Sequence, residues 1–212
     1  RLLFYLSTMQ AANENQWQTT KEAADRLIEL APTCIVGYRA AIEARLRSNK
    51  AAWHKEALGL ADVMIQKLPD EPLGYYYAAW ILAVPPDRPD PDAPKSDPKK
   101  AAELITFVPK DAPPPVLSRF RLYQVQHARR MLSLQSHKAG LSAEERRNIQ
   151  TTEMERIRGL IKQITDGSQM TRTEQEIWAD VALVGAGDVT TAEKIYRSWG
   201  NDQLELLSGL AN

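Results

Sequence analysis

A short signature occurs twice in the N-terminal part of the chain, with its prolines 37 residues apart. The run RLIELAP ends at Pro32 and leads through TCIVGY to Tyr38, and the run MIQKLP ends at Pro69 and leads through DEPLGY to Tyr75. A third, similar run, ELITFVP, ends at Pro109. Repetition at this period is typical of stacked helical hairpins, because one hairpin cannot bury its apolar face alone. We therefore expect a surface that binds rather than a pocket that reacts.

Apolar residues recur at helical spacing along nearly the whole chain, and no segment has the alternation of a strand. The pattern predicts helices over residues 2–13, 17–31, 34–47, 51–68, 73–84, 98–108, 116–138, 142–165, 171–185, 190–200 and 203–210. Asp97 followed by Pro98 predicts one helix start. Four other starts are predicted by capping boxes, in which a Ser or Thr precedes a Glu by three positions: Thr19 with Glu22, Ser142 with Glu145, Thr171 with Glu174 and Thr190 with Glu193.

The composition changes abruptly between Pro85 and Pro98, a stretch with six prolines and four aspartates. Such a stretch cannot continue a helix and buries too little apolar surface to offset its ordering entropy, so we expect an extended, mobile loop. The predicted organisation is helical hairpins over 1–84, this loop over 85–98, and further hairpins with two long helices over 99–212. Together they would form one continuous superhelix.

The repeated residues resemble the tetratricopeptide repeat, a helix-turn-helix unit of about 34 residues. Tyr38 and Tyr75 are similar to its early aromatic residues, Ala57 to its small residue in the second helix, and Pro32 and Pro69 to its terminal prolines. Near the C-terminus the resemblance returns with Gly187-Asp188, Ala192 and Tyr196, preceded by Trp178. It covers about 1–84 and 170–200 and is interrupted between them. It implies an irregular all-α array, a right-handed superhelix (α-solenoid) of antiparallel helix pairs.

Composition and motifs weigh against several other classes of function. Lys plus Arg equals Asp plus Glu at 27 each, so no net charge attracts nucleic acid. No apolar run reaches the roughly 20 residues that span a bilayer. The lone Cys34 excludes an intramolecular disulfide. The compartment stays open, with the cytoplasm favoured, and the start at Arg1 rather than Met suggests a fragment of a longer protein.

Catalytic and metal-binding patterns are also missing from the sequence. His54, His127 and His137 are scattered rather than paired at ligand spacing, so we expect no metal and no cofactor. The glycines of VGAGDVTTAEK (184–194) lack the lysine and Ser/Thr of a phosphate-binding loop, and a helix-helix turn explains them better. No nucleophile-elbow pattern is present. We predict that the segment is not an enzyme.

Two sets of residues are candidates for binding a protein or peptide partner. The family resemblance implies that Tyr76 and Trp80 face the groove of the superhelix, with Arg39 and Glu43 as their equivalents one repeat earlier. The second set lies on the helix that starts near Val116 and consists of Arg119, Arg121, His127, Arg129 and Arg130, which could grip an acidic peptide. The plainer interpretations are that the tryptophans are core residues and that the cationic face is solvated. In that case the cationic face would be partly paired with glutamates of the next helix, namely Glu144, Glu145, Glu153 and Glu155.

The sequence thus favours a non-catalytic scaffold or adaptor that binds a peptide along its concave wall. Two alternatives remain open. One is a self-assembly module, in which an unpaired final helix over 203–210 stacks on the next copy to form a homo-oligomer. The other is an accessory domain of a larger enzyme or sensor kinase.

Overall fold

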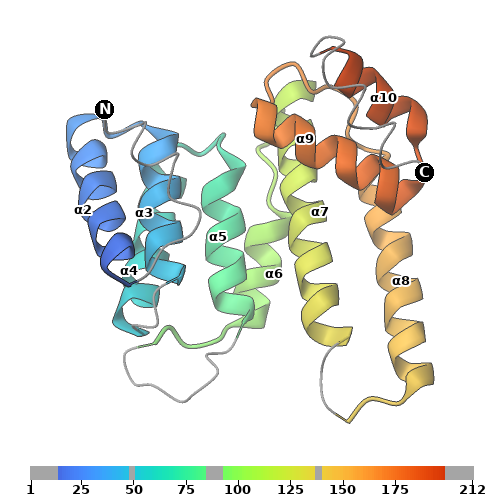
Figure 1. Ribbon diagram of the computed structural model, residues 1–212, viewed down its shortest axis with the longest axis horizontal. Helices are drawn as coiled ribbons and strands as arrows, with labels where there is room; N and C mark the ends of the chain where they lie inside the picture. Colours follow the sequence, from blue (N-terminus) through green and yellow to red (C-terminus); the bar gives the residue numbers. More distant parts are fainter. Residues whose placement is uncertain (1–13, 48–50, 85–92, 137–139, 199–212) are drawn as a thin grey trace. The chain divides into compact units, whose positions relative to one another are not determined.

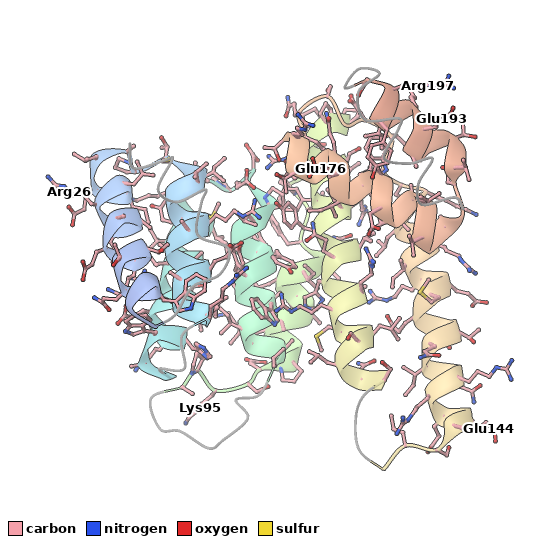
Figure 2. All side chains as sticks on the ribbon, viewed as in Figure 1. Arg26, Lys95, Glu144, Glu176, Glu193 and Arg197 are labelled. Carbon is pink, nitrogen blue, oxygen red and sulfur yellow. The ribbon has the colours of Figure 1, made fainter. Side chains whose placement is uncertain are left out.

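The computed structural model describes residues 14–47, 51–84, 93–136 and 140–198, and within them every regular element is a helix (Figure 1). The all-α prediction is confirmed. The predicted helices at 2–13 and 203–210, and most of the proline-rich segment, lie outside these residues. The elements in chain order are α2 (Glu14–Leu30), α3 (Ile35–Arg47), α4 (Ala51–Lys67), α5 (Pro72–Ala83), α6 (Pro98–Thr106), α7 (Pro114–Ser136), α8 (Ala143–Ile161), α9 (Arg172–Asp180), the π-helix η1 (Val181–Ala186) and α10 (Val189–Arg197).

The chain divides into two units, Arg1–Pro109 and Lys110–Asn212. The division follows α6, whereas the sequence had suggested a change of organisation at the proline-rich segment. Helix α6 belongs with the first unit because it packs against α5. Ala79, Leu82 and Ala101 form the buried centre of this contact, and Phe107, just after α6, stacks on Tyr75 with ring centroids 4.6 Å apart.

In the first unit each helix packs chiefly against the next helix in the sequence, from α2 through α6. Small residues fill the centre of the early hairpins, because they let helix axes approach closely. Fully buried residues of this kind include Ala24, Ala41, Ala57 and Ala61, and Tyr38, Ile42 and Met64 occupy the space between them. Burial of Ala57 agrees with its predicted position between packed helices.

The repeated glycine of the signature lies where one helix presses on the preceding one. A Cβ placed on Gly37 would lie 3.2–3.3 Å from side-chain atoms of Ile28 and Leu27 on α2. At the equivalent Gly74, a Cβ would lie 3.1 Å from the Ile65 side chain and 3.2 Å from the Ile65 backbone nitrogen on α4. The tyrosine that follows is buried at both places, and the Tyr38 hydroxyl donates to the Pro32 carbonyl at 3.2 Å.

A buried arginine ties the first three described helices together. Arg45 of α3 donates from Nη2 to Asp25 of α2 at 2.9 Å and from Nε to Glu56 of α4 at 3.0 Å. Its Nη1 donates to the Ala41 carbonyl at 3.0 Å, and Lys21 adds a second cation 3.2 Å from Asp25. All three nitrogens of the buried guanidinium have hydrogen-bond acceptors. These bonds offset the free-energy cost of removing the charge from water.

The second unit is built on the hairpin of α7 and α8, with α9, η1 and α10 lying across one end of it (Figure 1). Its core gathers residues from both long helices and from the segment after them, namely Leu122, Val125, Ala128, Ile157, Ile161, Ile164, Met170 and Val181. A smaller cluster of Ala179, Ala192 and Ile195 joins α9 to α10.

Three of the five predicted helix caps form as expected. Asp97 accepts from the Lys100 backbone nitrogen, and the capping boxes at Ser142 and Thr171 are complete. The other two predictions are wrong. Thr19 lies inside α2, which is already helical at Glu14, and Thr190 lies inside α10, whose N-cap is Asp188. A Thr and a Glu three residues apart cap a helix only where the preceding backbone is not helical.

The predicted helix over 171–185 changes its winding partway. It is an α-helix as far as Asp180 and a π-helix from Val181 to Ala186, and Gly187 ends it in the left-handed conformation at φ 68°. Arg158 of α8 donates to the Gly185 carbonyl at 3.2 Å. The turn at Gly187 and Asp188 joins two helices, as the sequence indicated.

Candidate functional site

The first predicted set comes together on neighbouring helices of the first unit. Glu43 of α3 accepts at one oxygen, Oε1, from Arg39 Nε at 3.1 Å and from the hydroxyl of Tyr77 on α5 at 2.7 Å. Arg39 and Glu43 are one turn apart on α3, and their side chains are 45% and 34% exposed. The two helices thus share a polar group that remains accessible to solvent.

Tyr77 was not predicted, although it completes this group. Its neighbour Tyr76 was predicted, but only 8% of it is exposed, and its ring lies 5.4 Å from that of Tyr77. Trp80 follows Tyr77 by three positions on the same side of the helix, and it is half-buried. Of the two aromatic residues expected to face a partner, Trp80 is the one with accessible ring surface.

The start of α3 adds apolar surface to the same side. Val36 precedes Arg39 by three residues, and Glu43 follows by four, so the three share one face of the helix. Val36 is 49% exposed. We call Val36, Arg39, Glu43, Tyr77 and Trp80 the α3–α5 face. It combines an aliphatic end, a charged centre and an indole.

The second predicted set, on α7, is largely engaged within its own unit. Arg119 donates from Nε and Nη2 to Glu174 of α9, and Arg121 donates from Nη1 to Gln124 one turn ahead at 2.7 Å. Arg129 binds Asp180 at 2.8 Å. The alternative that paired these cations with glutamates of α8 is therefore wrong for Arg119 and Arg129, whose carboxylates come from α9. Arg130 is exposed.

His127 lies on α7 in a setting that disfavours its charged form. Burial, followed by the nearby cations of Arg156 and Arg130, lowers the pKa of His127 from 6.5 to about 4. Its Nε2 is buried and has no hydrogen-bond partner in the structure. At neutral pH the imidazole is uncharged, so it would not attract an acidic peptide as a cation.

The tryptophans divide between core and surface. Trp53 is buried, with Lys21 over its ring at 5.8 Å, as a core interpretation expects. Trp17, Trp80 and Trp178 are half-buried, and Trp199 lies outside the described residues.

The described part of the chain has neither a cluster of metal ligands nor a membrane-spanning helix. No group of three or more His, Cys, Asp or Glu side chains there gathers closely enough to hold a metal ion. Nor does any helix in those residues combine the length and apolar character needed to cross a bilayer. Cys34 is a free thiol at the turn before α3.

Comparison with protein-family models, with curated proteins and with solved structures found no match to this chain. The resemblance to tetratricopeptide repeats therefore rests on the residues that carry it, chiefly the paired Gly-Tyr signature.

Proposed function

We propose that this chain is a non-catalytic protein-interaction segment that binds a peptide along the α3–α5 face. The observation that carries the proposal is the shared group of Arg39, Glu43 and Tyr77, which joins α3 to α5 and leaves the side chains of Arg39 and Glu43 accessible. Because the hydroxyl of Tyr77 fixes Glu43, the carboxylate is held in one place and loses little freedom when a partner binds.

The chemistry of this face suggests what a partner would offer. An aliphatic or aromatic side chain would lie on the indole of Trp80, and an amide or cationic group would reach the carboxylate of Glu43. Arg39 would contact an acceptor on the peptide, and a second apolar side chain would lie against Val36. Aromatic and arginine residues dominate binding energies in such contacts, so Trp80 and Arg39 would contribute most.

A selection experiment tests the proposal. Peptides are selected from a random display library against the full chain, and their affinities are measured by fluorescence polarisation. Trp80→Ala and Arg39→Ala should each weaken binding at least tenfold. Lys55→Ala, at an exposed position of α4, serves as the control and should leave affinity unchanged.

The result that overturns the proposal is equally specific. Selected peptides would bind the Trp80 and Arg39 variants as tightly as the parent chain, or no peptide would be enriched. Light scattering over a range of concentrations would accompany the selection. If the molecular mass rises with concentration, and if this rise is smaller for the Val36→Asp variant, the α3–α5 face mediates self-assembly instead.

A further inference from the structure

A pocket of about 410 Å³ opens in the second unit, between the segment 164–168, α9 and α10. Its volume falls within the range of sites for small molecules, about 300–1,000 Å³. It lies in a different unit from the α3–α5 face and shares no residue with it.

The apolar part of the pocket is a fixed surface. Ile164 and Ile195 are 6% and 7% exposed, and Trp178 packs against both apolar clusters of this unit. Gly167 lies directly against the indole, since a Cβ there would come within 2.6 Å of Trp178 Cζ3. Gln175 holds the same segment by donating to the Gly167 carbonyl at 3.4 Å. The wall is therefore in place before any ligand arrives.

Two opposite charges line the pocket as well. Asp166 accepts from the Ser168 backbone nitrogen at 2.8 Å, and hydrogen bonds from Ser168 hold the pKa of the Asp166 carboxyl below its usual value. Lys194 of α10 has no carboxylate within ion-pair distance among the described residues. The pocket thus offers one carboxylate, one ammonium and an indole.

We propose that this pocket binds one apolar α-amino acid in its zwitterionic form. The ligand's ammonium group would bind Asp166, its carboxylate would bind Lys194, and its side chain would lie on Trp178 between Ile164 and Ile195. A ligand with only one charge would make only one of these two contacts, and hydrogen bonds between charged groups are the stronger ones. The proposal does not depend on the peptide-binding function.

The experiment uses the full chain and calorimetry, with amide chemical shifts of Gly167 and Ser168 as a second readout. L-phenylalanine and L-leucine should bind with a dissociation constant of about 1 mM or lower. N-acetyl-L-phenylalanine lacks the ammonium group and L-phenylalaninamide lacks the carboxylate, so each should bind at least tenfold more weakly. D-phenylalanine should also bind more weakly, because three contacts at separate points distinguish enantiomers.

Substitutions at the two charged positions complete the test. Lys194→Gln and Asp166→Asn keep the size and polarity of each side chain and should each weaken L-phenylalanine binding about tenfold. Lys162→Gln, at an exposed position just after α8 and outside the pocket, is the matched control. The Lys194 variant should lose the preference for L-phenylalanine over its amide, which a general loss of structure would not produce.

Three outcomes would overturn the proposal. The first is no heat and no shift with either amino acid up to about 20 mM, well above the expected dissociation constant. The second is equal binding of the acetylated or amidated ligand, which would indicate a peptide terminus or simple apolar contact. The third is equal binding by the Lys194, Asp166 and Lys162 variants.

Discussion

Arg119 donates from both Nε and Nη2 to a single oxygen of Glu174, at 3.1 Å and 2.9 Å. The other oxygen of Glu174 accepts from the backbone nitrogen and the hydroxyl of Thr171, at 2.8 Å and 2.9 Å. One carboxylate therefore caps α9 and attaches it to α7. Glu174 is 3% exposed, so its replacement would break an ion pair that is largely shielded from solvent.

Glu174→Gln should lower the free energy of unfolding by about 3 kcal/mol, because it breaks a buried ion pair. The matched control is Glu145→Gln in the capping box of α8, which has the same local hydrogen bonds but is exposed. It should cause a clearly smaller loss. Urea unfolding followed by circular dichroism measures both, and equal losses would show that Glu174 acts only as a cap.

Gly74→Ala should destabilise the first unit by about 1–2 kcal/mol, because the new methyl group would press on the backbone of Ile65 and Ala61, which cannot move aside. Gly37→Ala should be nearly neutral, since only the side chains of Leu27 and Ile28 must shift. Gly59→Ala in α4, where a Cβ meets nothing within 4 Å, should stabilise by about 1 kcal/mol through helix propensity. Thermal unfolding of the three variants would test this order, and a stabilising Gly74→Ala would contradict it.

Tyr76→Ala should destabilise the fold by about 3 kcal/mol or more, as expected for loss of a large buried side chain. Trp80→Ala should cost less stability, since part of its ring is already exposed. The family resemblance implied that both residues face the groove, so it did not distinguish the two substitutions. Chemical denaturation separates them, and a larger loss at Trp80 would mean that its indole is the stronger core contact.

Stability should rise between about pH 4 and pH 6.5 because of His127. Its pKa is about 4 in the fold and 6.5 when exposed, so in this interval the unfolded chain binds the proton more readily. Acid therefore favours unfolding, by about 2 kcal/mol after solvent screening. The His127→Gln variant should lose this part of the pH dependence. The measurement is the midpoint of urea unfolding at pH 7, 6, 5 and 4.5. The prediction is contradicted if this midpoint changes with pH equally in the parent chain and in the His127→Gln variant.

Features that depend on nearby residues were the ones that sequence reasoning could predict. The caps at Asp97, Ser142 and Thr171 and the turn at Gly187 are of this kind, and so is the all-helical class. The capping boxes at Thr19 and Thr190 failed because nothing in four residues shows whether the backbone before them is already helical.

Contacts between distant positions were beyond such reasoning. Glu174 lies 55 residues from Arg119, and Tyr77 lies 34 residues from Glu43. Charge alone suggested partners on the next helix, α8, whereas the crossing of α9 over the α7–α8 hairpin supplies Glu174 and Asp180 instead. No sequence motif indicated the pocket beside Trp178. Its residues come from three separate segments, and none of these segments carries a recognisable binding pattern.

The π-helix Val181–Ala186 has a consequence for how this chain can be aligned. A π-turn accommodates one residue more than an α-turn, so each residue after it is rotated relative to the face set by α9. An alignment that continued the α-helical spacing of α9 through residues 181–186 would therefore assign these side chains to the wrong face of the helix.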